Sequence, residues 1–190
     1  MRIEEAISNT YPTTITIIDV ESTCWKNPRD QGKEVSVIIE LGIANIINGK
    51  IKREEPIFIK PQHSKISPFC TQLTTITPEL IKERGLDPEE GFRRLAKVLN
   101  KNVWGSYGFY DLKQIRKMID LYKIDFKLPP KHINVKELYG KLVMKSKDPY
   151  AAPGVKRTMK ALGMQFEGTL HRGADDAYNI ARIYLEIINR

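Results

Sequence analysis

Two acidic residues, Asp19 and Glu21, stand at the end of an apolar and β-prone run over residues 15–18. This run predicts a buried strand, in which side chains two positions apart share a face. Asp19 and Glu21 would then point the same way, and two such close carboxylates repel one another unless a cation lies between them. A divalent metal ion prefers carboxylate oxygens and would supply that cation. The alternative is a strand that ends in a polar loop with both carboxylates in water.

Further candidate residues lie much later in the chain. Asp111 follows a short predicted strand and a glycine-containing turn, and His171 precedes Asp175 and Asp176 near the start of the last predicted helix. Taken singly, an acid in the first turn of a helix is explained by the helix dipole. A lone histidine before a helix is more often a structural or surface residue. If the first and fourth predicted strands are neighbours, however, these side chains meet the acidic pair at one end of the sheet.

The predicted elements follow the order β-β-β-α-α-β-α-β-α-α-α. The strands cover residues 14–20, 35–47, 51–59, 103–104 and 132–135, and the helices cover residues 77–85, 87–99, 110–122, 136–145, 153–162 and 175–188. Residues 60–77 are interpreted as a long connection. A three-strand antiparallel run followed by alternating strands and helices resembles the order of the ribonuclease H-like fold. The expected fold class is therefore α/β, with a mixed five-stranded sheet and helices on both faces.

Length and charge narrow the class of protein. The 190 residues fit a single domain, residues 1–190, with residues 1–12 as an N-terminal arm. No apolar stretch approaches the length that spans a bilayer, and the N-terminus lacks a signal-peptide pattern, so we expect a cytoplasmic protein without a membrane partner. The formal net charge of +8 favours a polyanionic partner such as nucleic acid.

Three motifs in order make the sequence similar to the DEDDh class of 3′–5′ exonucleases. They are the DVEST segment at residues 19–23, the pair Tyr110-Asp111, and His171 five residues before Asp176. The flanks resemble the branch that trims the 3′ ends of histone messenger RNA and small regulatory RNA, with its KapD-like bacterial relatives. They read DVESTCW at residues 19–25, FCTQLTTI at residues 69–76 and EGTLHRGADDAYNIARI at residues 167–183.

Two departures from that branch are visible. Thr75 stands where the branch usually has glycine, at a loop expected near the 3′ end of the substrate. The second motif, WGSYGFYD at residues 104–111, is slightly longer than the common form. Asp111 still follows an aromatic residue and is kept as the metal ligand.

The resemblance implies hydrolysis of RNA phosphodiester bonds from the 3′ end by two divalent ions, Mg²⁺ or Mn²⁺, with release of 5′-nucleotides. Asp19 would bridge the two ions. Glu21 and Asp176 would complete the coordination of the first ion, and Asp111 would hold the second ion through water. His171 would take the proton from the attacking water, because an imidazole titrates near neutrality.

The same resemblance implies contacts to the terminal nucleotide. Backbone groups of Ser22 and Thr23 and the side chains of Leu73 and Thr74 would hold it. Phe69, Trp25, Tyr107 or Tyr110 would stack on a base, with core packing as the alternative for each. The expected partners are single-stranded nucleic acid 3′ ends, with RNA favoured and single-stranded DNA as a second substrate. A binding module without the chemistry and a DNA-directed repair exonuclease are the alternatives. Asp175 is left to cap the last helix or to contact the neighbours of the histidine.

Overall fold

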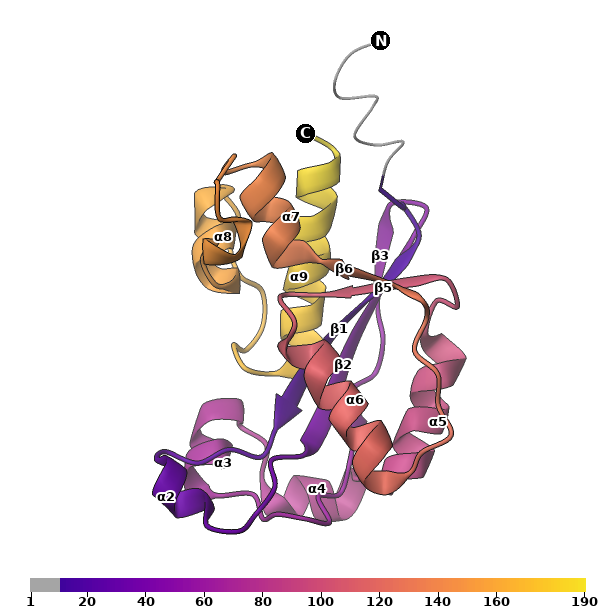
Figure 1. Cartoon of the computed structure of the whole chain (residues 1–190), viewed down its shortest axis with the longest axis vertical. Coiled ribbons are helices and arrows are strands. Elements are labelled where there is room, and N and C mark those ends of the chain that lie inside the picture. The colour runs from indigo at the N-terminus through magenta and orange to yellow at the C-terminus, as the bar shows by residue number, and fades with distance from the viewer. Residues whose placement is uncertain (1–10) are drawn as a thin grey trace.

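A single mixed sheet organises the computed structural model, which describes residues 11–190 (Figure 1). The predicted arm over residues 1–12 lies almost entirely outside these residues. The strands are β1 (Ile15–Ser22), β2 (Ile38–Ile47), β3 (Lys50–Arg53), β4 (Ile57–Phe58), β5 (Val103–Ser106) and β6 (Lys131–Asn134). Their order is β3-β2-β1-β5-β6, and β4 pairs with β2. Strand β1 runs antiparallel to β2 and parallel to β5, so the sheet is mixed as predicted.

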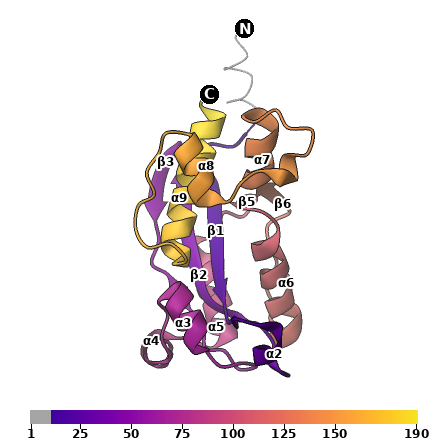
Figure 2. The same cartoon turned by 90° about the vertical axis from the view of Figure 1, so that its left-hand side faces the viewer.

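Helices cover both faces of this sheet (Figure 2). They are α2 (Pro28–Gln31), α3 (Pro68–Thr74), α4 (Pro78–Arg84), α5 (Pro88–Val98), α6 (Tyr110–Tyr122), α7 (Val135–Leu142), α8 (Val155–Ala161) and α9 (Gly173–Ile188), with a 3₁₀ turn at Pro149–Ala151. Helices α5 and α6 pack on one face, and α7, α8 and α9 pack on the other. Within residues 11–190, no helix has both the length and the apolar character needed to cross a bilayer.

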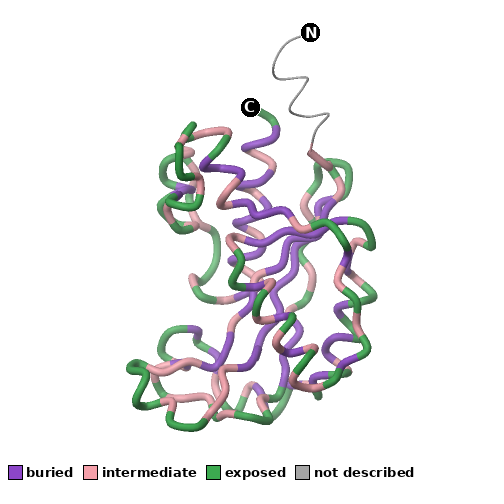
Figure 3. Tube along the Cα trace, viewed as in Figure 1, coloured by how far each residue is buried: buried purple, intermediate pink, exposed green. Residues whose placement is uncertain are grey.

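The side chains of β1 alternate between the two faces. Ile15 and Ile17 belong to the buried cluster under α9, whereas Ile18 and Val20 belong to the cluster under α5 and α6. All four are buried, in the part of the chain where Figure 3 shows the strands as the core of the molecule. Because the alternation has a period of two, the next residues on the α9 face are the predicted acidic pair. Strand β1 therefore places the carboxylates of Asp19 and Glu21 on the α9 face, at the end of the buried core.

The prediction of five strands is wrong, because the expected third strand over residues 51–59 is interrupted. Strand β3 ends at Arg53 and β4 begins at Ile57, with Glu54-Glu55-Pro56 between them. Proline has no N–H to donate to a neighbouring strand. Within residues 11–190 the sheet therefore has six strands, and β3 and β4 occupy the place of the expected third.

The predicted long connection over residues 60–77 is also wrong in part, because it contains α3. The hydroxyl of Ser67 accepts a hydrogen bond from the N–H of Cys70 at 3.0 Å, and Pro68 occupies the first helical position. This is the same start signal that correctly predicted α4 at Thr77 and Pro78. Helix α3 packs its buried Cys70 below the end of β1, where the thiol contacts the carbonyl oxygen of Ser22 at 3.6 Å.

Thr75 ends α3 in a conformation that suits glycine. Its φ and ψ are 62° and 7°, in the left-handed region, and its N–H donates to the carbonyl oxygen of Thr71 at 2.8 Å. The left-handed region costs an L-residue about 1–2 kcal/mol, and a β-branched side chain is especially uncommon there. The branch that this sequence resembles has glycine at this position, so the substitution leaves the loop shape in place at a cost in stability.

Replacing Thr75 with glycine is expected to stabilise the protein by about 0.5–1 kcal/mol, after the larger entropy of glycine in the unfolded chain is subtracted. This corresponds to a rise in Tm of about 2 °C, measured by thermal unfolding followed by circular dichroism. Thr75→Ala is the matched control, because it removes the hydroxyl and keeps the backbone strain. An equal rise in both variants would contradict the assignment of strain to this backbone.

Candidate active site

A cavity of about 570 Å³ opens at the carboxyl end of β1. It brings together the five residues that the sequence predicted to act together, although they lie on four separate segments. The residues are Asp19, Glu21, Asp111, His171 and Asp176. The predicted convergence at one end of the sheet is therefore observed.

Strand β1 extends beyond its neighbour β5, so β5 provides no strand partner beside the half-buried acidic pair. The parallel pairing joins Thr16 to Trp104 and Ile17 to Gly105, and β5 ends at Ser106. Past that point the N–H of Val20 has no strand partner on this side. It donates instead to Oδ1 of Asp111 at 3.0 Å. Asp111 is the second residue of α6, so this bond attaches the start of α6 to β1 beside Asp19 and Glu21.

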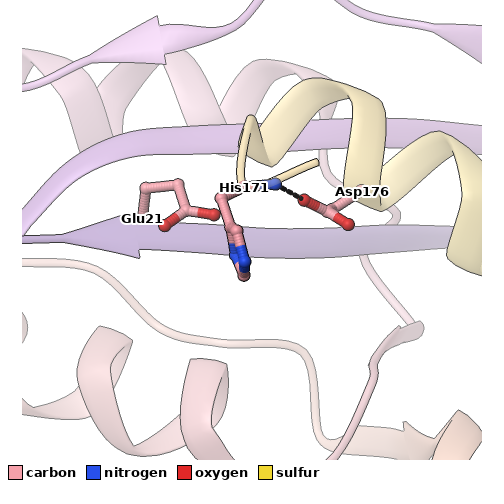
Figure 4. A group of neighbouring side chains, drawn as sticks. All are labelled: Glu21, His171 and Asp176. Atoms are coloured by element: carbon pink, nitrogen blue, oxygen red, sulfur yellow. Dashed lines mark hydrogen bonds between the residues drawn. The ribbon is translucent and has the colours of Figure 1, made fainter. Parts of the chain in front are cut away.

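The histidine and the last acidic residue are attached to each other through the backbone. The N–H of His171 donates to Oδ2 of Asp176 at 2.7 Å, and φ of His171 is 61° (Figure 4). Glu21, His171 and Asp176 each present one ligand atom, and these atoms lie within 4.8 Å of one another. Asp176 is buried at the start of α9, whereas His171 is exposed. The imidazole is thus accessible at the edge of a buried carboxylate cluster.

Glu40 holds the start of α9 against the sheet, although it is not among the predicted site residues. It lies on β2 opposite Glu21 and is fully buried. Its carboxylate accepts hydrogen bonds from Nε of Arg172 and the N–H of Gly173, both at 3.2 Å, and from the N–H of Ala174 at 3.3 Å. A lone acid within the apolar strand over residues 38–47 was the signal available in the sequence, because a buried carboxylate needs donors.

Two glycines allow this close approach. A Cβ on Gly42 of β2 would lie 1.8 Å from the carbonyl carbon of Gly173, and a Cβ on Gly173 would lie 3.0 Å from the carbonyl oxygen of Asp19. The first turn of α9 therefore touches the backbones of β1 and β2 directly. This contact places Asp176 beside Glu21.

Asp175 faces away from the cavity. Its Oδ1 accepts from Nη1 of Arg53 at 2.9 Å, and its Oδ2 accepts from the N–H of Thr169 at 2.8 Å. These bonds attach the segment before His171 to β3 and leave the neighbouring Asp176 as the residue that lines the cavity. Of the two roles left open for Asp175, the contact with the segment beside the histidine is the one observed.

Crowding of carboxyl groups in a buried place alters their protonation. Burial, followed by the charges of Asp111 and Asp176, raises the pKa of Asp19 well above its ordinary value. Burial, followed by the charge of Asp176, raises the pKa of Glu21 to about 9. Burial also raises the pKa of Asp176 to about 7 and that of Asp111 to about 6. The cluster is therefore a place where negative charge is unfavourable without a counterion.

The donor set fits a hard divalent cation. Among residues 11–190, none of the four carboxylates forms an ion pair with a lysine or an arginine, and the guanidinium of Arg172 pairs with Glu40 instead. Carboxylate oxygens are the ligands that Mg²⁺ and Mn²⁺ prefer, and a bound cation would remove the repulsion that raises these pKa values. The residues that could hold such ions are Asp19, Glu21, Asp111 and Asp176.

The predicted contacts to the terminal nucleotide divide into two groups. Leu73 and Tyr110 are exposed, and Tyr110 lines the cavity, so both remain available to a ligand. Thr74 is fully buried and its hydroxyl donates to the carbonyl oxygen of Cys70 at 2.8 Å. Its side chain is therefore not placed to touch a substrate.

Ser22 and Thr23 belong with the buried group. The N–H of Thr23 donates to the carbonyl oxygen of Val37 at 2.9 Å, its carbonyl oxygen accepts from Ser36, and its hydroxyl bonds to Ser64. Ser22 is also buried, and its carbonyl oxygen already contacts a thiol of α3. Every polar group of Thr23 has a partner within the protein, so this predicted role in substrate binding is not supported by the structure.

The raised pKa of Asp19 makes a prediction about the metal-free protein. Between the unfolded pKa and the higher folded pKa, the folded state binds more protons than the unfolded state, so this carboxyl group lowers stability as pH rises. In chelator at about pH 8, Asp19→Asn is expected to stabilise the protein by at least about 1 kcal/mol, which is about 2–4 °C in Tm. The difference should shrink as the pH approaches about 4.

Thermal unfolding of the parent protein and the variant at several pH values measures this difference. Glu83→Gln, an exposed change on α4, is the matched control and should show no such gain. With Mn²⁺ added, the parent protein should become more stable than Asp19→Asn, because the parent then gains a counterion for Asp19. A variant less stable than the parent in chelator at pH 8 would contradict the predicted repulsion.

Comparison with known proteins identifies relatives among nucleases that act on 3′ ends. The 3′-5′ exoribonuclease 1 of Rattus norvegicus is 26% identical over 193 residues, covering 95% of this chain and 54% of that protein. The Homo sapiens 3′-5′ exoribonuclease 1 is 26% identical over 206 residues, covering 97% of this chain and 55% of that protein. The chain thus spans about half the length of these two curated relatives.

Solved structures share the fold. The nuclease domain of 3′hExo, a DEDDh family member bound to rAMP, superposes with a TM-score of 0.75 at 24% identity, covering 93% of this chain and 92% of that chain. A 3′-exonuclease studied for 3′-end specific recognition of the histone mRNA stem-loop has a TM-score of 0.74 at 27% identity, with 92% and 81% covered. The predicted ribonuclease H-like architecture is confirmed. The family model described as Exonuclease, RNase T, matches residues 16–184, and the chain therefore belongs to this exonuclease family.

Proposed function

We propose that this chain is a metal-dependent 3′–5′ exonuclease that removes 5′-nucleotides one at a time from the 3′ end of RNA. The observation that carries the proposal is the single cavity that holds four carboxylates and an exposed imidazole. Phosphodiester hydrolysis needs a base for water and neutralisation of a leaving oxyanion, and this set of side chains fits both needs.

Asp19, Glu21, Asp111 and Asp176 would hold two divalent ions, Mg²⁺ or Mn²⁺. When bound, such ions lower the pKa of water and neutralise charge that develops on phosphate oxygens. Asp111 accepts a hydrogen bond from the N–H of Val20, and Asp176 accepts one from the N–H of His171. Each carboxylate keeps further lone pairs that could bind a metal ion or its water.

His171 is the general base of this proposal. Its side chain is exposed beside Glu21 and Asp176, where a water can approach it (Figure 4). The hydrogen bond to Asp176 and the attachment of the preceding segment through Asp175 fix the backbone of His171, from which the imidazole extends. A fixed position matters because proton transfer requires the base within hydrogen-bond reach of the water.

RNA is the proposed natural substrate. The support comes from relatives named as exoribonucleases and from the net charge of +8, which favours a polyanion. A binding module without chemistry would not need all five residues of the cavity, and here all five are present. Single-stranded DNA shares the phosphodiester that the cavity would act on, so competition between matched RNA and DNA oligonucleotides decides the preference.

Labelled RNA tests the proposed reaction. With Mg²⁺ or Mn²⁺, 3′-labelled RNA should release its label as a mononucleotide at once, and 5′-labelled RNA should shorten step by step. Chelator should stop both, and His171→Ala should slow release by about 10²–10⁴-fold while leaving RNA binding intact. Cuts inside the strand, or release in chelator, would contradict a metal-dependent exonuclease. RNA that is bound but never cut would instead favour the binding module.

The two adjacent aspartates should respond differently to the same change. Asp176→Asn is expected to lower nucleotide release by about a hundredfold or more, because it removes a proposed metal ligand. Asp175→Asn keeps one oxygen that can accept from the N–H of Thr169, but it loses the charge and the acceptor that face Arg53. Because Asp175 does not line the cavity, most activity should remain. Release rates at saturating Mn²⁺, with circular dichroism to confirm folding, measure both. Equal losses would overturn the assignment of Asp176.

A further inference from the structure

A second hollow of about 560 Å³ adjoins the cavity of the carboxylates. Lys156, Arg157 and Leu170 line both spaces, so the two form one continuous groove. The second space lies between α8 and the segment that leads to α9, which run side by side in Figures 1 and 2. None of the five predicted catalytic residues lines it.

The α8 wall of this groove is positively charged and lacks counterions. Lys156, Arg157 and Lys160 are exposed, and none of them forms an ion pair with an acidic side chain in the described part of the chain. The neighbouring Arg53 and Arg182, by contrast, pair with Asp175 and Glu167 at 2.9 and 3.0 Å. Three cations within five residues of this helix would repel one another, and phosphate groups would relieve that repulsion.

The opposite wall is apolar. Met164, Phe166 and Leu170 line the hollow and are only partly buried. An aromatic ring beside a row of cations is the combination that binds single-stranded nucleic acid, because bases stack on the ring while phosphates meet the charges. The space is therefore suited to a nucleotide rather than to a simple anion.

Both walls are held in place by hydrogen bonds. The hydroxyl of Tyr107 donates to the carbonyl oxygen of Pro153 at 2.7 Å and lies 2.6 Å from the hydroxyl of Thr158, which fixes α8 to the turn before Asp111. On the other side, Arg182 donates to the carbonyl oxygen of Gln165 at 2.9 Å. A groove fixed in this way loses little conformational entropy when a ligand binds.

We propose that this groove binds the nucleotides on the 5′ side of the one that is removed, and this rests on the proposed exonuclease function. Lys156, Arg157 and Lys160 contact successive phosphates, and Phe166 stacks on a base. The 5′-to-3′ direction of the bound strand is inferred from the position of α3. Helix α3, which carries the exposed Leu73 predicted to hold the terminal nucleotide, lies on the opposite side of the carboxyl end of β1 from α8 (Figure 1).

A second basic hollow provides the contrast. It is lined by Lys113, Arg116 and Lys117 of α6, together with Asp120 and Leu121. It contains an acidic side chain, has no aromatic residue and shares no residue with the carboxylate cavity. Removing charges from this hollow therefore controls for net charge alone.

The test compares two triple variants of equal charge. The groove variant is Lys156→Ala, Arg157→Ala and Lys160→Ala. The control variant combines Lys113→Ala and Arg116→Ala from the α6 hollow with Lys101→Ala, which lies outside both hollows, and all six positions are exposed. KM and kcat for nucleotide release are measured with an RNA dinucleotide and an RNA octanucleotide. In the groove variant KM should rise by about tenfold for the octanucleotide and by about twofold for the dinucleotide, with the loss in KM rather than in kcat. The control variant should match the parent.

Binding is measured separately from hydrolysis. A fluorescent RNA octanucleotide is titrated against each triple variant in an Asp19→Asn, Glu21→Gln background, and Kd is followed by anisotropy at several salt concentrations. The groove variant should raise Kd by about tenfold and reduce the slope of log Kd on log salt by about 2, since each lost phosphate contact removes about 0.7. The control variant should change neither quantity.

The outcomes separate the two proposals. If the parent releases no nucleotide from any RNA, the proposed function fails, and anisotropy still decides whether the groove binds the strand. If the parent is active but the groove and control variants share the same KM and Kd, the groove proposal is overturned. Equal losses for the dinucleotide and the octanucleotide would also overturn it, because the cations would then act on the reacting nucleotide.

Discussion

Repulsion between four carboxylates is the constraint on which this structure depends. Asp19, Glu21, Asp111 and Asp176 share one cavity, and burial and mutual proximity oppose their ionisation. The protein does not neutralise them with lysine or arginine among the described residues. It fixes two of them, Asp111 and Asp176, with backbone N–H groups. The fold thus holds the acids in position and leaves their charge to be balanced from outside the chain, which is what a metal site requires.

The sheet and α9 share the task of positioning these acids. Strand β1 brings one pair to the α9 face because its side chains alternate, and its overhang beyond β5 frees the N–H that holds Asp111. The first turn of α9 reaches the sheet only because glycines face each other across the contact. Buried Glu40 then accepts hydrogen bonds from the N–H groups of that turn. Glu40 does not line the cavity itself, but it holds in place the turn that carries Asp176.

Much of the site was predictable because its signals are local. The alternation along β1, the helix starts after β5 and before α9, and the family motifs together placed five residues correctly in one cavity. The burial of Thr23 and Thr74 was not predictable in the same way. That of Thr74 depends on α3 packing under β1, and that of Thr23 on contacts with Val37 and Ser64. The start signal of α3 at Ser67 and Pro68 was present but was interpreted as part of a connection. Glu40 was missed because its partners lie more than a hundred residues away.

The interruption at Pro56 has a consequence for the solubility of the protein. It leaves β3 as a four-residue outer strand, and three of its four side chains are exposed and cationic. Outer strands with free backbone groups invite pairing with another molecule, and natural proteins discourage this with short length, lysines and prolines. The short strand, its lysines and the following Pro56 all occur here at one edge of the sheet. Aggregation through intermolecular strand addition is therefore disfavoured on this side of the sheet.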